Sequence, residues 1–251
     1  MKIIACYSNK GGVGKTAAAV NLAYMMAAAG KRVLLCDMDP QGASGFYFRV
    51  KPSKKLTDTS FFKDVKKFTD AIRGSDYENL DILPANMDFR EFDIFLSRMR
   101  NSRSRLKKAL QAVEKEYDII VLDCPPSISV LSENIFRSAD LILVPVIPTT
   151  LSQRTFEQLV AFFKDNELQT RKLHGFFSMV QKIKKLHAET MDSMNTAHKK
   201  RFLKTHIPFS SDIERMGIHR APAIATTPHS AASRAYQALG EEIGKKLFTE
   251  P

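Results

Sequence analysis

The stretch Ser8–Thr16, SNKGGVGKT, decides the fold, because it joins a glycine-rich loop to a lysine and a threonine. It follows an apolar run, IIACYS at 3–8, and leads into an alanine-rich segment that predicts a helix from about Lys15 to Ala29. In this order, backbone N–H groups of the loop wrap phosphates and the helix N-terminus adds positive potential. Lys15 is then placed to neutralise the β- and γ-phosphates, and the Thr16 hydroxyl to bind Mg²⁺.

Short apolar runs alternate with helical patterns along the rest of the chain. Continuous apolar strands separated by helices predict an α/β fold, doubly wound, whose mostly parallel sheet has helices on both faces. No repeat, linker or change of composition divides the chain, so we expect one domain, 1–251. Gly30 is placed to end the first helix. The other expected strands are 32–37, 80–85, 118–123, 141–147 and 175–180, with helices at 88–116 and 188–205 and one or two short helices within 46–79.

The chain is strongly basic, with a formal net charge of +11 and a pI near 9.6. Such an excess favours nucleic acid or an anionic membrane surface as a partner, although many solvated lysines would give the same total. Cys6, Cys36 and Cys124 lie in apolar runs without a CxxC pair, which indicates buried thiols in a reducing compartment and no structural metal site. There is no signal peptide and no membrane-spanning run, so we expect a cytoplasmic protein.

Three ordered motifs carry a family resemblance: KGGVGKT at 10–16, CDMDPQG at 36–42 and VLDCPPS at 121–127. They resemble the deviant Walker A, Walker A′ and Walker B motifs of the ParA/MinD ATPases, and the resemblance extends over nearly the whole chain. Further similarity at 139–149 and 227–243 places the chain near the short, Soj-like ParA proteins. The resemblance implies a P-loop ATPase that uses ATP and Mg²⁺.

The resemblance also implies roles for the lysine and the acids of these motifs. Lys10 matches the signature lysine, which crosses the interface of a nucleotide-sandwich homodimer and contacts the phosphates bound by the other subunit. The alternative is that Lys10 lies at the rim of the loop and makes no contact with the other subunit. The phosphates bound in two facing subunits repel each other. A lysine ammonium group contributed by each subunit offsets that repulsion and holds the subunits together. Asp39 matches the residue that orients the attacking water, and Asp123 acts on Mg²⁺ through a coordinated water. Asp37 either supports the magnesium shell or has a structural role.

Nucleotide contacts come from the loop and, by resemblance, from two later segments. Adenine contacts are implied near Gln181 and at Pro208 and Phe209. The chain departs from relatives here, since it reads PFSSDIERMGI at 208–218 where they carry PRNVRLSEAPS. An arginine that some relatives use for DNA would fall near Asp212, so that contact is supplied elsewhere or lost. The expected nucleotide-binding set is Lys10, Gly11, Gly12, Val13, Gly14, Lys15, Thr16, Ala17, Gln181, Pro208 and Phe209; the catalytic set is Lys10, Lys15 and Asp39; the metal set is Thr16, Asp37 and Asp123.

Two basic segments are candidates for binding DNA. The first includes the predicted helix 188–205. Its apolar and aromatic positions recur at helical spacing, namely Met191, Met194, His198 and Phe202, which would leave Lys200 and Lys204 on the opposite face of the helix. A second segment, between Arg98 and Lys108, reads either as a solvated helix face or as another basic patch. The expected DNA-binding residues are Lys182, Lys184, Lys185, Lys199, Lys200 and Lys204.

The favoured function is a ParA-type positioning ATPase. The family implies dimerisation on ATP, binding to nonspecific double-stranded DNA of the nucleoid, and release when a ParB-like or other small basic adaptor stimulates hydrolysis. Its cargo would be a plasmid, a chromosome or a protein assembly. A MinD-like membrane ATPase is the alternative. It would need an amphipathic C-terminal helix, but the chain end GEEIGKKLFTEP contains Glu241, Glu242 and Glu250 and offers lipid only Ile243, Leu247 and Phe248. A P-loop kinase or amidoligase would need substrate-binding insertions and would not need Lys10, and an iron–sulfur redox relative lacks the second cysteine.

Overall fold

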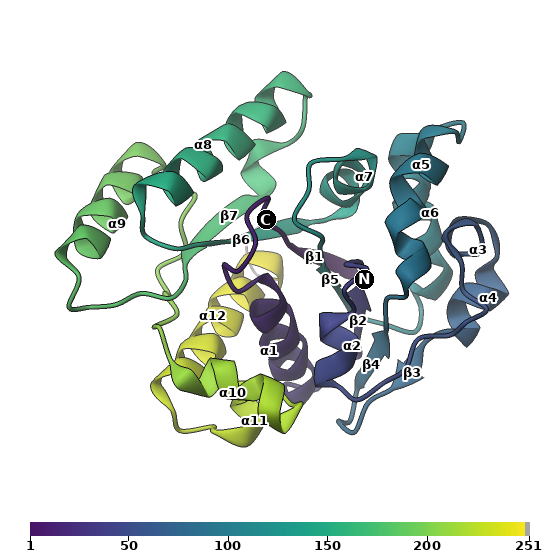
Figure 1. Ribbon diagram of the computed structural model, residues 1–251, viewed down its shortest axis with the longest axis horizontal. Coiled ribbons are helices and arrows are strands. Elements are labelled where there is room, and N and C mark those ends of the chain that lie inside the picture. Colours follow the sequence, from purple (N-terminus) through teal and green to yellow (C-terminus); the bar gives the residue numbers. More distant parts are fainter. Residues whose placement is uncertain (249–251) are drawn as a thin grey trace.

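The architecture is a seven-stranded sheet in the order β3-β4-β2-β5-β1-β6-β7, in a computed structural model that describes residues 1–248 (Figure 1). All neighbouring strands are parallel except β3 and β4, which are antiparallel. This arrangement confirms the predicted doubly wound α/β fold. The strands are β1 (Lys2–Cys6), β2 (Val33–Asp37), β3 (Arg73–Gly74), β4 (Leu80–Leu83), β5 (Ile119–Asp123), β6 (Leu141–Val146) and β7 (Leu173–Phe177).

Helices cover both faces of this sheet (Figure 1). One core cluster joins the sheet to α1, α10, α11 and α12, and a second joins the other face to α3 through α8. Strands β2, β5 and β6 are buried along their whole length, which explains their continuous apolar sequences. The α-helices are α1 (Lys15–Ala28), α2 (Ala43–Tyr47), α3 (Asp58–Lys63), α4 (Val65–Asp70), α5 (Phe92–Ser97), α6 (Arg105–Leu110), α7 (Val130–Ser138), α8 (Thr150–Asp165), α9 (Lys185–Ala197), α10 (Ser211–His219), α11 (Ala223–Thr226) and α12 (Ala231–Phe248).

The structure of α1 and of the turn after it agrees closely with the sequence prediction. Helix α1 ends at Ala28, one residue before the expected end, and Gly30 has a φ of 81°, in the left-handed region expected after a helix end. The three cysteines are buried free thiols, as predicted. The small alanine side chains of α1 are nearly all buried, which lets the helix pack closely on the sheet.

Two predicted helices are wrong in extent. The segment 88–116 is divided into short α and 3₁₀ pieces, η1 (Met87–Glu91), α5, η2 (Ser102–Ser104), α6 and η3 (Gln111–Val113), with Asn101 in a left-handed conformation at φ 57° between them. The predicted helix 188–205 is α9, which begins earlier and ends at Ala197. Lys200 has a φ of 70° and Lys204 follows it in irregular structure, so the two do not share a helix face.

The segment 46–79, where one or two short helices were expected, contains α3 and α4, and also β3, which was not predicted. A strand of two residues is too short to show a period in sequence. It pairs through Arg73 with Ile82 and through Gly74 with Asp81, and so extends the sheet at its edge.

Strand register brings the three motifs to one edge of the sheet. Cys6 of β1 and Asp37 of β2 are both register partners of Asp123 in β5. All three residues end their strands, so the glycine loop and the two acidic motifs leave the sheet side by side. Ligands of open α/β sheets bind at this carboxyl edge.

Candidate nucleotide site

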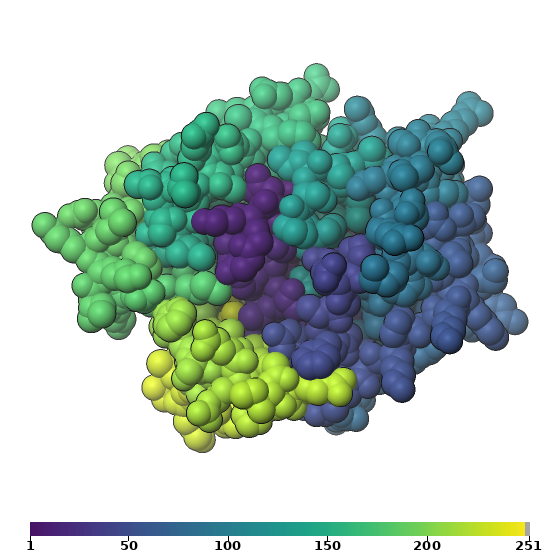
Figure 2. All heavy atoms as spheres, in the orientation of Figure 1, coloured from purple at the N-terminus to yellow at the C-terminus, as the bar shows by residue number. Residues whose placement is uncertain are grey.

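The loop between β1 and α1 requires glycine at two positions. Gly12 has a φ of 70° and Gly14 a φ of 94°, a region that residues with a Cβ rarely adopt. Gly14 is the N-cap of α1, and no side chain caps that end of the helix. The first N–H groups of α1 are therefore left for an anion, which the helix dipole also favours. Figure 2 shows this purple N-terminal segment reaching the surface near the middle of the face.

Lys15 is the cation enclosed by the loop, and its residue is only 8% exposed. Its Nζ donates a hydrogen bond to the carbonyl of Lys10 at 3.3 Å. Burial lowers the pKa of Lys15, and the negative charges of Asp123 and Asp39 oppose that shift. An ammonium group in this setting is poorly solvated, so an anionic phosphate entering the loop would gain a strong partner.

Two buried carboxylates, Asp37 and Asp123, lie at the same edge and are 0% and 1% exposed. Burial raises the pKa of Asp123 to about 6, while the nearby hydroxyls of Ser44 and Thr16 act in the opposite direction. Oδ2 of Asp123 accepts a hydrogen bond from Ser44 Oγ at 2.8 Å. Its Oδ1 is buried without a hydrogen-bond partner among residues 1–248. An unsatisfied buried carboxylate oxygen favours a nearby cation.

Asp37 and Asp39 are held in different ways. Both oxygens of Asp37 accept backbone N–H groups, at 3.2 Å from Asp39, 2.9 Å from Ser44 and 3.3 Å from Gly45. These bonds shape the turn after β2 and favour the structural one of the two roles considered for Asp37. Asp39 is partly exposed, and its Oδ1 accepts the Gln41 N–H at 3.0 Å. Its carboxylate is therefore anchored at the rim of the site.

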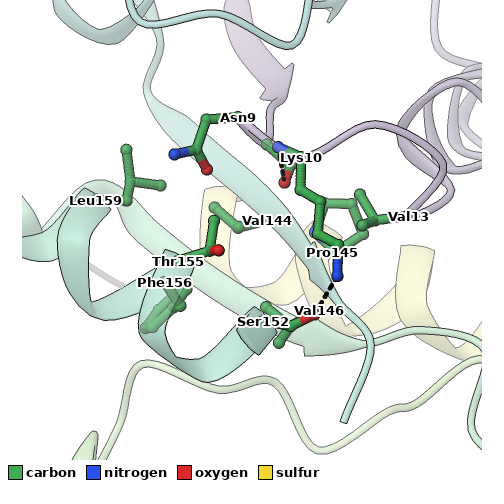
Figure 3. A pocket seen from close by; sticks show the side chains of 11 residues that line it. Asn9, Lys10, Val13, Val144, Pro145, Val146, Ser152, Thr155, Phe156 and Leu159 are labelled. Atoms are coloured by element: carbon green, nitrogen blue, oxygen red, sulfur yellow. Dashed lines mark hydrogen bonds between the residues drawn. The ribbon is translucent and has the colours of Figure 1, made fainter. Parts of the chain in front are cut away.

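Lys10 reaches toward α8 (Figure 3). Its Nζ donates to Ser152 Oγ at 3.3 Å, and its backbone N–H donates to Ser8 Oγ at 3.2 Å. Ser152 is 4% exposed and lies in the first turn of α8, where its N–H donates to the capping hydroxyl of Thr149. In a single copy of the chain, the Lys10 ammonium is therefore held by its own subunit through one neutral hydroxyl.

The residues predicted to contact adenine are only partly brought together. Pro208 and Phe209 line a pocket with Gly14 of the loop, and Phe209 is 53% exposed. Gln181 does not line this pocket, and its backbone N–H donates to His187 Nδ1 at 3.1 Å. The pocket beside the loop thus places a proline and an exposed aromatic ring where a flat base could stack.

Comparisons with known proteins agree with this geometry. A family model described as an AAA domain matches residues 1–175. The sporulation initiation inhibitor protein Soj of Bacillus subtilis (strain 168) is 32% identical over 248 residues, covering 96% of this chain and 98% of Soj. The chain belongs to the ParA/MinD family of P-loop ATPases. The chromosome partitioning protein ParA of Myxococcus xanthus (strain DK1622) is 29% identical, covering 97% of this chain and 88% of that protein.

One solved structure of the same fold contains a bound ATP analog and magnesium. The cobyrinic acid a,c-diamide synthase from Mycobacterium smegmatis, with bound ATP analog and magnesium, superposes with a TM-score of 0.82 at 23% identity. The match covers 99% of this chain and 96% of the synthase. At that identity the likeness shows the fold alone. The expectation that the chain is a P-loop ATPase related to chromosome and plasmid partitioning proteins is confirmed by the sequence relatives.

The six lysines predicted to bind DNA are all exposed, but they form two groups. Lys182, Lys184 and Lys185 lie in the turn before α9 and at its first residue, and Lys185 pairs with Glu189 at 3.6 Å. The other three follow the end of α9, and the Lys204 backbone N–H donates to Glu242 of α12 at 2.8 Å. The six lysines therefore lie at the two ends of one helix and not along one of its faces. They are Lys182, Lys184, Lys185, Lys199, Lys200 and Lys204.

Sequence reasoning missed residues that distant elements bring into the site. Ser44, whose hydroxyl donates to Asp123, follows the second motif but lies 79 positions from its partner. Tyr236 of α12 lines the pocket beside Gly14 and is fully enclosed, with 2% exposure. A serine shortly after DMDPQG was the only local signal, and nothing near Tyr236 marks it as part of a site.

The helices within residues 1–248 include none that could span a lipid bilayer.

Proposed function

We propose that this protein is a ParA-type positioning ATPase that closes into a homodimer around ATP, binds nonspecific DNA as that dimer, and leaves DNA when a partner stimulates hydrolysis. One observation carries the proposal: a glycine loop with buried Lys15 lies beside the buried Asp123, whose Oδ1 is unsatisfied. Positive and negative groups are thus presented together, as triphosphate and Mg²⁺ require. Homology to Soj and ParA supports the partitioning role.

Mg²⁺ fits the site because a buried carboxylate oxygen lacks a partner within the described chain. The residues that would hold it are Thr16, through its hydroxyl, and Asp123, with Asp37 supporting the turn beside them. A bound Mg²⁺ would compensate phosphate charge during phosphoryl transfer. Within the protein, Lys15 and the N–H groups of the loop position the phosphates, and the anchored Asp39 carboxylate orients the attacking water.

Lys10 is the residue on which dimerisation depends. In the single subunit its ammonium has one hydroxyl acceptor, Ser152 Oγ. The phosphates of a facing subunit would offer a much stronger, charge-assisted partner. The lysine can therefore exchange a weak internal contact for a strong contact across the interface, which makes dimerisation depend on ATP.

The dimer proposal is tested with Lys10→Ala and Lys15→Ala, using an exposed lysine variant, Lys51→Ala, as the matched control. Mass is measured by light scattering during gel filtration, with Mg²⁺ and a non-hydrolysable ATP analogue. We expect wild type and Lys51→Ala to dimerise, Lys10→Ala to bind nucleotide as a monomer, and Lys15→Ala to lose nucleotide. A Lys10→Ala protein that dimerises like wild type would show that Lys10 does not act across the interface.

Hydrolysis and release are tested through Asp39. We expect Asp39→Ala to bind ATP and dimerise while its hydrolysis rate falls, so that the dimer stays on DNA. Phosphate release and retention on a DNA column measure the two effects. A hydrolysis rate equal to that of wild type would remove Asp39 from the mechanism. A ParB-like or other small basic adaptor should raise the hydrolysis rate of wild type and leave that of the variant unchanged.

Nonspecific DNA binding is assigned to the lysines at the two ends of α9. Phosphate contacts of this kind carry no sequence preference, and their affinity falls steeply with salt. We expect Lys199→Glu with Lys200→Glu to weaken DNA binding without changing ATP affinity. The matched control reverses Lys66 and Lys67 of α4, on the opposite side of the molecule from α9 (Figure 1). Equal losses in the two double variants would mean that net charge, and not this patch, sets the affinity.

The MinD-like alternative is disfavoured by the packing of α12. Ile243 is fully buried and Leu247 is 9% exposed, so two of the three apolar residues available for lipid face the core. Phe248 is 46% exposed and lies under the ammonium of Lys31, with 5.4 Å between Nζ and the ring centroid. Glu250 lies outside the described residues. Co-sedimentation with anionic liposomes, with and without ATP, should show no binding.

A further inference from the structure

A second charged pocket lies at the opposite edge of the sheet from the nucleotide loop. It forms where η2 and α6 meet the last turn of α7 and the segment just before β7. Those segments lead into the amino ends of β6 and β7, whereas the nucleotide loop leaves the carboxyl end of β1. A strand of five residues separates the two edges by roughly 16 Å. We name it the α6–α7 pocket; its charged lining residues are Arg103, Lys107, Arg137, Lys172 and Glu167.

Positive charge exceeds negative charge inside this pocket by three. Arg103 is compensated from outside, since its Nε lies 3.4 Å from Glu133 Oε2. Lys107, Arg137 and Lys172 have no carboxylate within 4 Å among residues 1–248. Glu167 also lines the pocket but forms no ion pair with these three residues. The like charges therefore repel one another, which lowers the stability of the folded protein.

Arg137 gives the clearest sign of a missing partner. Its Nε is buried and has no hydrogen-bond acceptor in the described part of the chain. A buried N–H donor of a charged group costs free energy when it is unsatisfied. Arg137 lies in the last turn of α7 and lines the pocket, so an acceptor that enters the pocket meets a guanidinium that has one unsatisfied donor.

Lys172 shows the same shortage of negative charge. Burial lowers its pKa, Asp140 opposes that shift, and the positive charges of Lys107 and Arg171 lower the pKa further. The Asp140 carboxylate is already engaged, because its Oδ2 accepts the Ile3 N–H at 2.8 Å. A bound anion would therefore raise the pKa of Lys172.

The pocket is large enough for a polyatomic anion. Its volume is about 230 Å³, more than ten times the roughly 15 Å³ that a single water molecule requires. The planar fork of an arginine and the ammonium groups of two lysines match the tetrahedral oxygens of a phosphate group. Phe136 and Leu168, which are 1% and 8% exposed, form the apolar side of the pocket.

We propose that the α6–α7 pocket binds a phosphate group, carried either on the backbone of a nucleic acid or on a free phosphorylated small molecule. The site is complete in one subunit and does not depend on the ATP dimer. It also divides the basic segment between Arg98 and Lys108 into two parts, because Lys107 faces the pocket while Lys108 on the same helix does not line it.

The test measures binding of pyrophosphate by calorimetry, with the nucleotide loop saturated by ADP and Mg²⁺. The variants are Lys107→Gln and Arg137→Gln. The matched control is Lys108→Gln, one position along α6 and also exposed. Losing one charged contact should weaken binding about tenfold in the first two variants and leave the control within twofold of wild type. Because Lys107 is exposed, its variant tests the site even if Arg137→Gln fails to fold.

A second arm identifies the source of the phosphate. If a short DNA duplex displaces pyrophosphate and binds Lys107→Gln more weakly than Lys108→Gln, the site takes a backbone phosphate. If DNA binds both variants like wild type while pyrophosphate binding falls only in Lys107→Gln, the site takes a free phosphate compound. Undetectable pyrophosphate binding by wild type, or equal binding by Lys107→Gln and Lys108→Gln, would overturn the proposal.

Discussion

Replacing Asp123 by asparagine should stabilise the nucleotide-free protein while removing the magnesium-dependent ATP hydrolysis that we propose. Asp123 is 1% exposed, and burial raises its pKa to about 6. In an unfolded chain an aspartate has a pKa of about 3.9. The folded state thus binds this proton more tightly, so the contribution of Asp123 to stability decreases as the pH rises from about 4 to about 6. At pH 7 the full penalty, about 3 kcal/mol at 1.36 kcal/mol for each pH unit, is present.

Asparagine keeps the shape of the side chain and can still accept the hydrogen bond from Ser44 Oγ. We therefore expect Asp123→Asn to raise the free energy of unfolding at pH 7 by up to about 3 kcal/mol, and by close to zero at pH 4, where the folded wild type is already protonated. Losing the Asp123 charge also removes one of the influences that raise the pKa of Asp37, which adds to the gain.

The assay is urea unfolding in EDTA without nucleotide, at pH 7 and at pH 4, with ATP hydrolysis measured separately. The control is Asp118→Asn, because the exposed Arg32 lowers the pKa of Asp118 to about 2, the opposite direction. That variant should lose a little stability at pH 7 instead of gaining it. If Asp123→Asn is no more stable than wild type at pH 7, burial of an ionised carboxylate is not what limits this site.

Three glycine variants test other parts of the structure by urea unfolding and nucleotide titration. Gly14→Ala should lose about 1–2 kcal/mol and most nucleotide affinity, because its φ of 94° forces a Cβ into a region that alanine rarely adopts. Gly175→Ala should cost about 1–3 kcal/mol, since the new Cβ would lie 2.6 Å from the Phe202 ring. Gly240→Ala should cost little, because its Cβ meets only the flexible end of Met25 and alanine favours the helix. Equal losses at 175 and 240 would contradict this reasoning.

The sequence predicts the sheet well because each buried strand is a continuous apolar run between helices. It fails in 88–116 for a physical reason. Phe89, Phe92, Leu96, Leu106 and Leu110 keep a helical spacing and are all buried, yet they belong to separate short pieces that pack on the same core. Between them lie clustered arginines and the residues Asn and Ser, which repel or favour turns in a helix. Apolar spacing records which side faces the core, not whether the helix is continuous.

The candidate site, like the fold, could be predicted from the sequence only in part. The positions of the loop and acidic residues could be predicted because their signals are local: glycine where φ is positive, lysine at the end of the loop, and aspartate at the end of a strand. The pocket beside Gly14 could be predicted only in part: the sequence places Pro208 and Phe209 there, but Tyr236 and Ile213 reach it from helices near the end of the chain. Their side chains are ordinary core residues in sequence. Only the packing of α10 and α12 beside α1 gives them a place in the site.

The charges of the site explain why nucleotide binding and stability should be coupled. Without ligand, Asp123 is an ionised group that burial disfavours, and Lys15 is a cation that burial also disfavours. In the proposed function, ATP with Mg²⁺ would supply the opposite charge to each of them at once. A ligand at one hundred times its dissociation constant stabilises the folded state by about 2.7 kcal/mol, similar in size to the penalty at Asp123. Wild type should therefore gain more stability from ATP and Mg²⁺ than Asp123→Asn, even though the variant starts from the more stable empty state.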